Sequence, residues 1–333
     1  MEPKLRGNPV FWLFLTVVLF GAWWLVHSLG RGRQIVKALL HIPAVDLLAI
    51  CAVSVCYFVV QGTVLALSYR ILKIDRNRLY GILMFLSSNF VNTVAPVVGL
   101  SGSAYIVFIE NKQGISKPRA ILLTIIFYLI DYGAFLVLLL IAATYLAVTS
   151  SLPRPILVGT VVFSGLIALL AAATITLLTH PAWLQAVLSR IKRIGKERAD
   201  EFAGQTTHAY EEARHSPKLI AQTFAFAFLN HFLAMGILAI ALHASGVVPS
   251  VPLLLAGYSI GTLLAVVSIT PAGLGVAEGG MVAAFTGLGV PVETAVLASL
   301  LFRFGIVIIP LLLGLPALHR IQEQASSSSP QSV

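Results

Sequence analysis

Three ionisable side chains stand inside apolar parts of the sequence, where each needs a partner. Asp131 and Arg303 lie in long apolar runs, and Glu278 follows a Gly-rich segment. Charged groups at membrane depth are costly, so they usually pair with one another or contact a ligand. The guanidinium of Arg303 suits a phosphate-bearing headgroup because it can form two parallel hydrogen bonds. The alternative is a structural ion pair of Arg303 with Asp131 or Glu278.

Two Pro- and Gly-rich breaks, at 95–99 and 271–275, supply a second kind of candidate site. Proline removes a backbone donor and glycine admits conformations that a helix cannot use, so each region is expected to form two half-helices joined by a turn. Exposed N–H groups at the start of the second half-helix suit a phosphate, through aligned donors and the helix dipole. The alternative is that the glycines only permit a tight turn and close packing.

These features define one set of candidate ligand-binding residues. Asn89 and Asn92 belong to it because they precede the first break, although asparagines there more often cap freed backbone groups. Ser101 and Ser103 contribute hydroxyls just after that break. The full set is Asn89, Asn92, Pro96, Gly99, Ser101, Ser103, Asp131, Pro271, Gly273, Gly275, Glu278 and Arg303.

The composition places these residues in a membrane protein. Hydrophobic residues make up 58% of the 333 positions, charged residues 11%, and the mean hydropathy is +0.93. No soluble domain of this size needs so much apolar surface. A helix of about 20 apolar residues crosses the hydrocarbon core, and the expected fold is an all-α integral membrane protein with an uncleaved first span. Six stretches qualify as full spans: 9–29, 46–68, 120–147, 154–178, 219–243 and 294–318.

The two broken regions, 80–109 and 252–288, are expected to form re-entrant helical hairpins. Basic loops at 70–79 and 110–119 flank the first region, so the positive-inside tendency places both loops in the cytoplasm. The segment 180–218 is also basic, which puts both termini inside and opens the second hairpin to the outside. The result is a multi-pass protein of the cell (inner or plasma) membrane. The basic residues left outside are Arg31, Arg33, Lys37 and Arg154.

The halves 46–147 and 219–318 then share the order span, hairpin, span in opposite orientations, which is an inverted repeat within a membrane domain of residues 1–322. Pro96 and Pro271 occupy matching breaks, 175 residues apart. Interrupted helices at corresponding positions of two halves indicate the binding site of a transporter. The placement of the breaks supports the repeat more than the sequence identity between the halves does.

Two further segments complete the organisation. Residues 183–198 have apolar side chains on one helical face and basic ones on the rest, which is typical of a helix lying on anionic lipid. The alternative is a solvated basic loop. The Ser-rich tail 323–333 lacks material for a core and is expected to be disordered.

Several kinds of ligand are not expected. The histidines have no metal-ligand spacing, and the mid-span His231 is more often part of hydrogen-bonded packing than of a ligand site. A Gly-rich nucleotide loop with its lysine is missing from the sequence. We therefore expect no metal, no cofactor, no direct ATP hydrolysis and no nucleic-acid partner.

Two segments carry a resemblance to a known family. One is 88–131, with its Asn, Pro and Gly break; the other is 270–279, Thr-Pro-Ala-Gly-Leu-Gly-Val-Ala-Glu-Gly, with Arg303 downstream. They resemble the transmembrane, flippase-like domain of the lysylphosphatidylglycerol synthase family, whose motif is close to Gly-Gly-Leu-Gly-Val-Arg-Glu-Gly. Ala272 and Ala277 replace its first glycine and its arginine, whereas Glu278 and Arg303 match.

The resemblance covers nearly the whole chain and implies a role in lipid handling. Full-length family enzymes also carry a soluble domain that transfers lysine from an aminoacyl-tRNA. Because this chain ends at Val333 with a Ser-rich tail, it is expected to be a stand-alone membrane form and not an enzyme.

The favoured function is translocation of a lipid between leaflets, through a cavity between two opposed hairpins. The residues alone suggest an anionic or polar headgroup, and the resemblance implies a phospholipid or another isoprenoid or hopanoid-type lipid. A membrane enzyme is disfavoured because Asp131, Glu278 and Arg303 are few and scattered in the sequence. The remaining alternative is a non-catalytic subunit or scaffold for a lipid-modifying enzyme such as a phosphatidylglycerol lysyltransferase. The expected partners are membrane lipids, with a second copy of the chain or a lipid-synthesising enzyme as further options.

Overall fold

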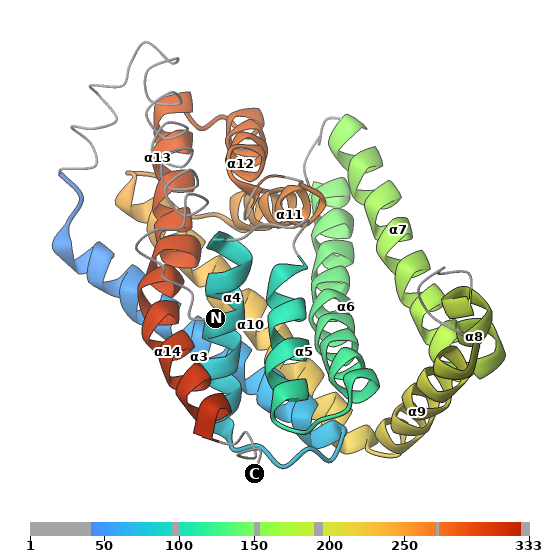
Figure 1. The fold of residues 1–333 in the computed structure, drawn as a ribbon. Helices are drawn as coiled ribbons and strands as arrows, with labels where there is room; N and C mark the ends of the chain where they lie inside the picture. Colours follow the sequence, from blue (N-terminus) through green and yellow to red (C-terminus); the bar gives the residue numbers. More distant parts are fainter. Residues whose placement is uncertain are drawn as a thin grey trace.

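The computed structural model describes residues 41–94, 100–149, 154–189, 196–268, 270 and 273–327, and every regular element in them is helical (Figure 1). In chain order the elements are α3 (Ala44–Ile71), α4 (Arg78–Val94), α5 (Ser101–Lys112), α6 (Lys117–Thr149), α7 (Arg154–Thr179), α8 (Pro181–Ser189), α9 (Lys196–Arg214), α10 (Pro217–Ala244), α11 (Val251–Val267), α12 (Val276–Gly287), α13 (Val292–Arg303), the π-helical segment η3 (Phe304–Ile308) and α14 (Ile309–Ser327).

Five helical stretches are long and apolar enough to cross a membrane: Ala44–Ile71, Lys117–Thr149, Gly159–Thr179, Pro217–Ala244 and Val292–Ser326. They correspond to five of the six predicted spans. The sixth prediction, 9–29, lies outside the described residues. The long helices follow from the sequence because an uninterrupted apolar run in lipid can satisfy its backbone groups only within the helix itself.

The two broken regions form pairs of shorter helices. Helices α4 and α5 contain 17 and 12 residues, and α11 and α12 also contain 17 and 12. Each pair stands between long helices in the chain: α4–α5 between α3 and α6, and α11–α12 between α10 and α13. In Figure 1 the two pairs lie toward opposite ends of the bundle. The breaks at Pro96 and Pro271 lie outside the described residues.

Close backbone contact fixes the position of α4 against α3. A Cβ atom added to Gly62 on α3 would lie 2.5 Å from the Cα of Ile82, and one added to Gly81 on α4 would lie 2.6 Å from the Cβ of Ala66. No side chain fits at either glycine without a shift of the helices. Small residues are the usual way for helices to approach in lipid, where the hydrophobic effect does not drive them together.

A buried carboxylate, Glu110, holds the end of the α4–α5 pair that lies away from the break between the two helices. Glu110 accepts hydrogen bonds from the hydroxyls of Tyr69 and Tyr80, both at 2.7 Å, and forms an ion pair with Arg76 at 3.0 Å. Partial burial alone would lower the pKa of Arg76, but the Glu110 carboxylate outweighs it and raises that pKa above its usual value. Through Tyr69, Tyr80 and Arg76, the Glu110 carboxylate joins α3, α4 and α5 at one end of the bundle.

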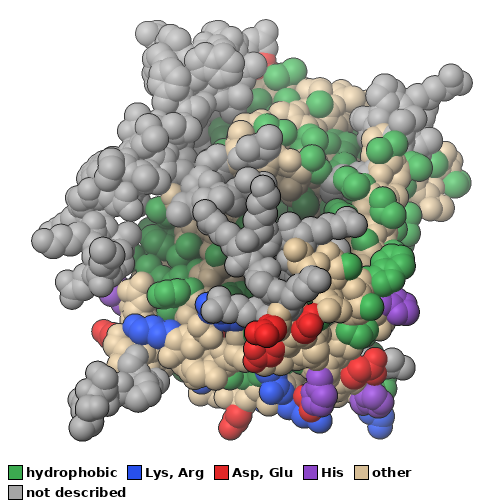
Figure 2. Space-filling model, turned by 45° about the vertical axis from the view of Figure 1, so that its right-hand side comes forward, with side chains coloured by type: hydrophobic (Ala, Val, Ile, Leu, Met, Phe, Trp, Pro, Cys, Tyr) green, Lys and Arg blue, Asp and Glu red, His purple; other side chains and the backbone are tan. Residues whose placement is uncertain are grey.

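The surface matches a membrane environment. Large apolar side chains are exposed on α7, among them Val161, Val162, Leu169 and Leu170. Figure 2 shows hydrophobic side chains spread over the described surface of one face, with charged side chains gathered near its lower edge. Apolar area of this extent is stable in lipid, not in water.

Two segments differ in detail from the sequence-based predictions. The segment 180–218 forms the helices α8 and α9; Trp183 on α8 is 64% exposed, and residues 190–195 lie outside the described part. The alanines 199, 203, 209 and 213 of α9 are buried, so this helix is packed and not solvated all round. Helix α14 continues through Ser327 and includes 323–327, which the sequence had assigned to the disordered tail.

Candidate functional site

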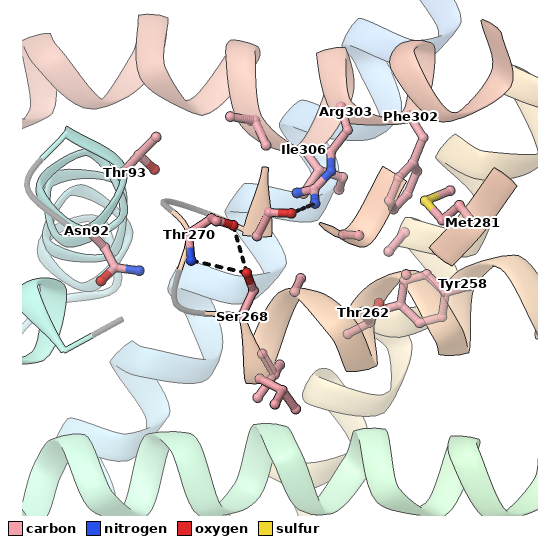
Figure 3. A pocket seen from close by; sticks show the side chains of 18 of the residues that line it. Asn92, Thr93, Tyr258, Thr262, Ser268, Thr270, Met281, Phe302, Arg303 and Ile306 are labelled. Atoms are coloured by element: carbon pink, nitrogen blue, oxygen red, sulfur yellow. Dashed lines mark hydrogen bonds between the residues drawn. The ribbon is translucent and has the colours of Figure 1, made fainter. Parts of the chain in front are cut away.

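A cavity of about 320 Å³ lies where the two helix pairs meet. Asn89, Asn92 and Thr93 of α4 form one wall, and Ser268 and Thr270, which follow α11, form the opposite one (Figure 3). The remaining walls come from α3, α6, α10, α11, α12, α13, η3 and the turn before α12. These parts contribute Tyr57, Tyr128, Tyr132, Ala234, Tyr258, Gly261, Thr262, Ala265, Val266, Val267, Gly273, Ala277, Met281, Phe302, Arg303, Ile306 and Val307. The cavity thus draws on both halves of the chain.

The structure brings some of the predicted site residues together and leaves others apart. Asn89, Asn92, Gly273 and Arg303 line the cavity. Gly275 and Glu278 lie directly behind the Gly273 turn. Ser101, Ser103 and Asp131 are not among the lining residues, and Pro96, Gly99 and Pro271 lie outside the described residues.

Arg303 and Glu278 form a buried ion pair at the cavity wall. The Nε of Arg303 lies 2.8 Å from Oε1 of Glu278, and its Nη2 donates to the carbonyl oxygen of Gly273 at 3.3 Å. The other carboxylate oxygen of Glu278 accepts a hydrogen bond of 2.7 Å from the N–H of Gly275. The Glu278 carboxylate therefore caps the first turn of α12 and also pairs with Arg303 of α13. Together these contacts fix the turn between α11 and α12 against α13.

The backbone around this ion pair is unusual in two places. Gly275 has φ 82° and ψ −43°, a combination that a side chain disfavours strongly. Immediately after Arg303 the helix widens into the π-helical segment Phe304–Ile308. Pro310 follows, and it has no N–H to donate to the carbonyl of residue 306, which favours an irregular turn. Single π turns of this kind are frequent at functional sites.

The α4 wall is built from amides and a hydroxyl. The Oδ1 of Asn92 accepts a long hydrogen bond of 3.5 Å from the N–H of Gly102 at the start of α5. Figure 3 shows the amide nitrogen of the same side chain directed toward the Ser268 and Thr270 turn. Thr93 donates to the carbonyl of Asn89 at 2.9 Å. The amide oxygen of Asn92 therefore accepts from the backbone at the start of α5, and its amide nitrogen faces the cavity.

The opposite wall is a small hydrogen-bonded turn. The hydroxyls of Ser268 and Thr270 are 2.7 Å apart, and the Thr270 N–H donates to the Ser268 oxygen at 3.1 Å (Figure 3). The Thr270 hydroxyl also donates to the carbonyl of Leu274 at 3.0 Å. Both residues stay accessible while their side chains order the turn.

Four tyrosines that the sequence analysis did not select complete the lining: Tyr57, Tyr128, Tyr132 and Tyr258. The rings of Tyr128 and Tyr132 lie 5.5 Å apart, centroid to centroid, on one face of α6. The spacing of four residues between Tyr128 and Tyr132 is visible in the sequence and indicates a shared helix face. The convergence of Tyr57 and Tyr258 from other helices depends on the tertiary structure.

Asp131 belongs to a hydrogen-bond network that reaches the cavity at Tyr258. Its Oδ1 accepts a hydrogen bond of 2.8 Å from Gln61, whose own oxygen accepts one of 2.6 Å from Asn230. His231 Nε2 lies 3.3 Å from the Asp131 carbonyl oxygen, and His231 Nδ1 lies 2.7 Å from the Tyr258 hydroxyl. A carbonyl can only accept, so Nε2 donates to it; in the neutral tautomer that this requires, Nδ1 accepts from Tyr258. The network joins α3, α6, α10 and α11.

The described part of the site offers hydrogen-bonding surface and one neutralised ion pair. Among the described residues, no three His, Cys, Asp or Glu side chains are grouped in a way that could hold a metal ion. The lining combines hydroxyls, amides and aromatic rings, which can bind a polar group by hydrogen bonds and stacking.

The chain was compared with known protein families and with curated proteins. No curated protein matches this chain. The family model described as "Lysylphosphatidylglycerol synthase TM region" matches residues 11–314, which is most of the sequence and includes every residue of the cavity. The match agrees with the resemblance carried by 270–279 and Arg303. The chain is a multi-pass membrane protein that belongs to the lysylphosphatidylglycerol synthase transmembrane family.

Proposed function

We propose that the chain moves a lipid with a polar headgroup from one leaflet of the cell membrane to the other. The observation that carries this proposal is the polar cavity between the α4–α5 and α11–α12 pairs, within a bundle of membrane-length helices. Irregular backbone and polar side chains are tolerated at membrane depth where they line a cavity. Family membership supports a role in lipid handling.

In this proposal the α4–α5 pair enters from the cytoplasm, the α11–α12 pair enters from outside, and the two form an inverted repeat. Three features support the arrangement: the basic ends of α4, α5 and α6, the order of elements around each pair, and the cavity that the end of α4 shares with the segment after α11. The headgroup would pass through the cavity while the acyl chains stay in lipid along the apolar outer face. No covalent step is involved.

Leaflet exchange in reconstituted vesicles tests the proposal. The purified chain is placed in liposomes with fluorescent lipids of several headgroups, and exchange is measured as the fraction that a membrane-impermeant reductant quenches over time. The protein is expected to accelerate exchange of at least one lipid well above the rate in protein-free vesicles.

A matched pair of variants links exchange to the cavity. Ile306 lines the cavity, whereas Ile308, two residues along the same π turn, is 37% exposed on the outer surface. Ile306→Trp is expected to fill the cavity and to abolish most of the exchange, and Ile308→Trp is expected to leave it unchanged. Equal rates for both variants would place the pathway elsewhere. A folded protein that exchanges none of the lipids would refute translocation and leave the scaffold role, which copurification with a lipid-modifying enzyme would then support.

A further inference from the structure

We propose that the cavity takes an uncharged, hydroxyl-bearing headgroup, that is, a sugar or another polyol. This inference rests on the proposed translocation and names the class of lipid that is moved. It departs from the expectation that Arg303 holds a phosphate.

The lining consists almost entirely of neutral hydrogen-bonding groups. Among the described lining residues Arg303 alone carries a charge at neutral pH. The hydroxyl and amide groups come from Tyr57, Asn89, Asn92, Thr93, Tyr128, Tyr132, Tyr258, Thr262, Ser268 and Thr270.

The one positive charge is already matched. Arg303 is held by Glu278 at 2.8 Å and by the Gly273 carbonyl at 3.3 Å, and both charged side chains are buried. A phosphate that approached Arg303 would also approach the Glu278 carboxylate, and the repulsion between them is strong where the dielectric constant is low. The pair therefore presents no net charge to an anionic headgroup.

A cationic headgroup finds no carboxylate in the described lining either. Glu278 is neutralised by Arg303, and Asp131 is not part of the lining; its Oδ1 accepts a hydrogen bond from Gln61. At the described lining, a headgroup of either charge would thus lose hydration without a direct ionic partner, which is unfavourable.

The hydroxyl groups of a sugar or polyol, in contrast, can form hydrogen bonds with this lining. The amides of Asn89 and Asn92 each offer donors and an acceptor. The hydroxyls of Thr262 and Thr270 can accept, because their protons are directed to Tyr258 and to the Leu274 carbonyl. The tyrosine rings provide flat faces for stacking against a sugar. The volume of about 320 Å³ lies at the lower end of ligand pockets, roughly 300–1,000 Å³, which fits a headgroup without its acyl chains.

A headgroup series with one lipid backbone tests the inference. The probes are fluorescent diacyl lipids that bear glucose, phosphoglycerol or trimethylammonium, in vesicles that contain the full chain. Exchange of the glucosyl lipid is expected to be at least about tenfold faster than that of either charged lipid. Exchange of the phosphoglycerol or trimethylammonium lipid at an equal or higher rate would overturn the inference.

A matched variant pair ties the preference to the lining. Thr262 lines the cavity, whereas Thr144 on α6 is exposed and donates to the carbonyl of Leu140 in its own helix. Each Thr→Val change removes one hydroxyl with little change of shape. Thr262→Val is expected to slow glucosyl-lipid exchange by about 2- to 10-fold, the loss of one hydrogen bond, and Thr144→Val is expected to have no effect. Equal behaviour of the two variants would contradict the inference.

A binding measurement separates this inference from translocation itself. Short-chain glucosyl and phosphoglycerol lipids are added to the protein in detergent, and the change in melting temperature is measured. Selective stabilisation by the glucosyl lipid with no exchange of any lipid would refute translocation and keep the headgroup assignment. Fast exchange of the phosphoglycerol lipid, with stabilisation by that lipid, would keep translocation and refute the assignment.

Discussion

At the scale of single residues, Arg303 forms the structural ion pair that was one of the two alternatives offered by the sequence. It pairs with Glu278 at the turn before α12, while its side chain also lines the cavity. The sequence could show that a charge at this depth needs a partner, but it could not choose between Glu278 and Asp131. That choice depends on α12 and α13 packing together, which brings Glu278 to Arg303 while Gln61 of α3 contacts Asp131.

The Arg303 and Glu278 pair gives a prediction about stability. Arg303→Ala leaves the Glu278 carboxylate buried without its partner, so the free energy of unfolding is expected to fall by about 3–5 kcal/mol. The double variant Arg303→Met with Glu278→Gln removes both charges and is expected to recover most of that loss. Unfolding in mixed detergent micelles measures both. If Arg303→Ala alone is as stable as the unmodified chain, the ion pair does not hold the turn.

At the scale of elements, the long helices could be predicted and the irregular ones could not. Uninterrupted apolar runs identified the five membrane-length helices, and the Pro- and Gly-rich segments marked where α4–α5 and α11–α12 are divided. The π turn Phe304–Ile308 was missed because its residues, Phe-Gly-Ile-Val-Ile, suit an ordinary apolar helix. The four-tyrosine lining was missed because it forms only when α3, α6 and α11 pack together.

The turn that begins α12 gives a prediction about backbone conformation. Gly275 has a positive φ, and Gly279, one turn later, is helical with no atom within 4 Å of an added Cβ. Gly275→Ala is expected to destabilise the protein by about 1–3 kcal/mol, the typical cost of a strained backbone conformation. Gly279→Ala is expected to be neutral or stabilising, because alanine favours a helix by roughly 0.5–1 kcal/mol over glycine.

Melting temperatures of the two glycine variants in one detergent give the comparison. Gly275→Ala should melt below the unmodified chain, and Gly279→Ala should melt at the same temperature or above it. The reverse order would mean that the turn conformation at Gly275 does not constrain α12, and the capping bond from Gly275 to Glu278 would then have little structural weight.

At the scale of the whole molecule, one helix pair must open to the cytoplasm and the other to the outside if the two pairs form one path between the leaflets. The end of α5 carries Lys112 among basic residues, whereas the loop between α10 and α11 carries Val248, which is 85% exposed in a segment without charge. The inverted arrangement places these two positions on opposite sides of the membrane. Both lie in described, accessible segments, away from the strained turn at Gly275.

Single-cysteine labelling decides this arrangement. In a chain with Cys51 and Cys56 replaced by serine, Lys112→Cys and Val248→Cys are made separately, and intact cells are treated with a membrane-impermeant maleimide. Val248→Cys is expected to react in intact cells, and Lys112→Cys only after the membrane is permeabilised, because the proposed arrangement places the basic end of α5 in the cytoplasm. Reaction of both cysteines from one side would mean that the two pairs open to the same compartment. The cavity would then be a site reached from one leaflet, and a path between leaflets would need a different route through the bundle.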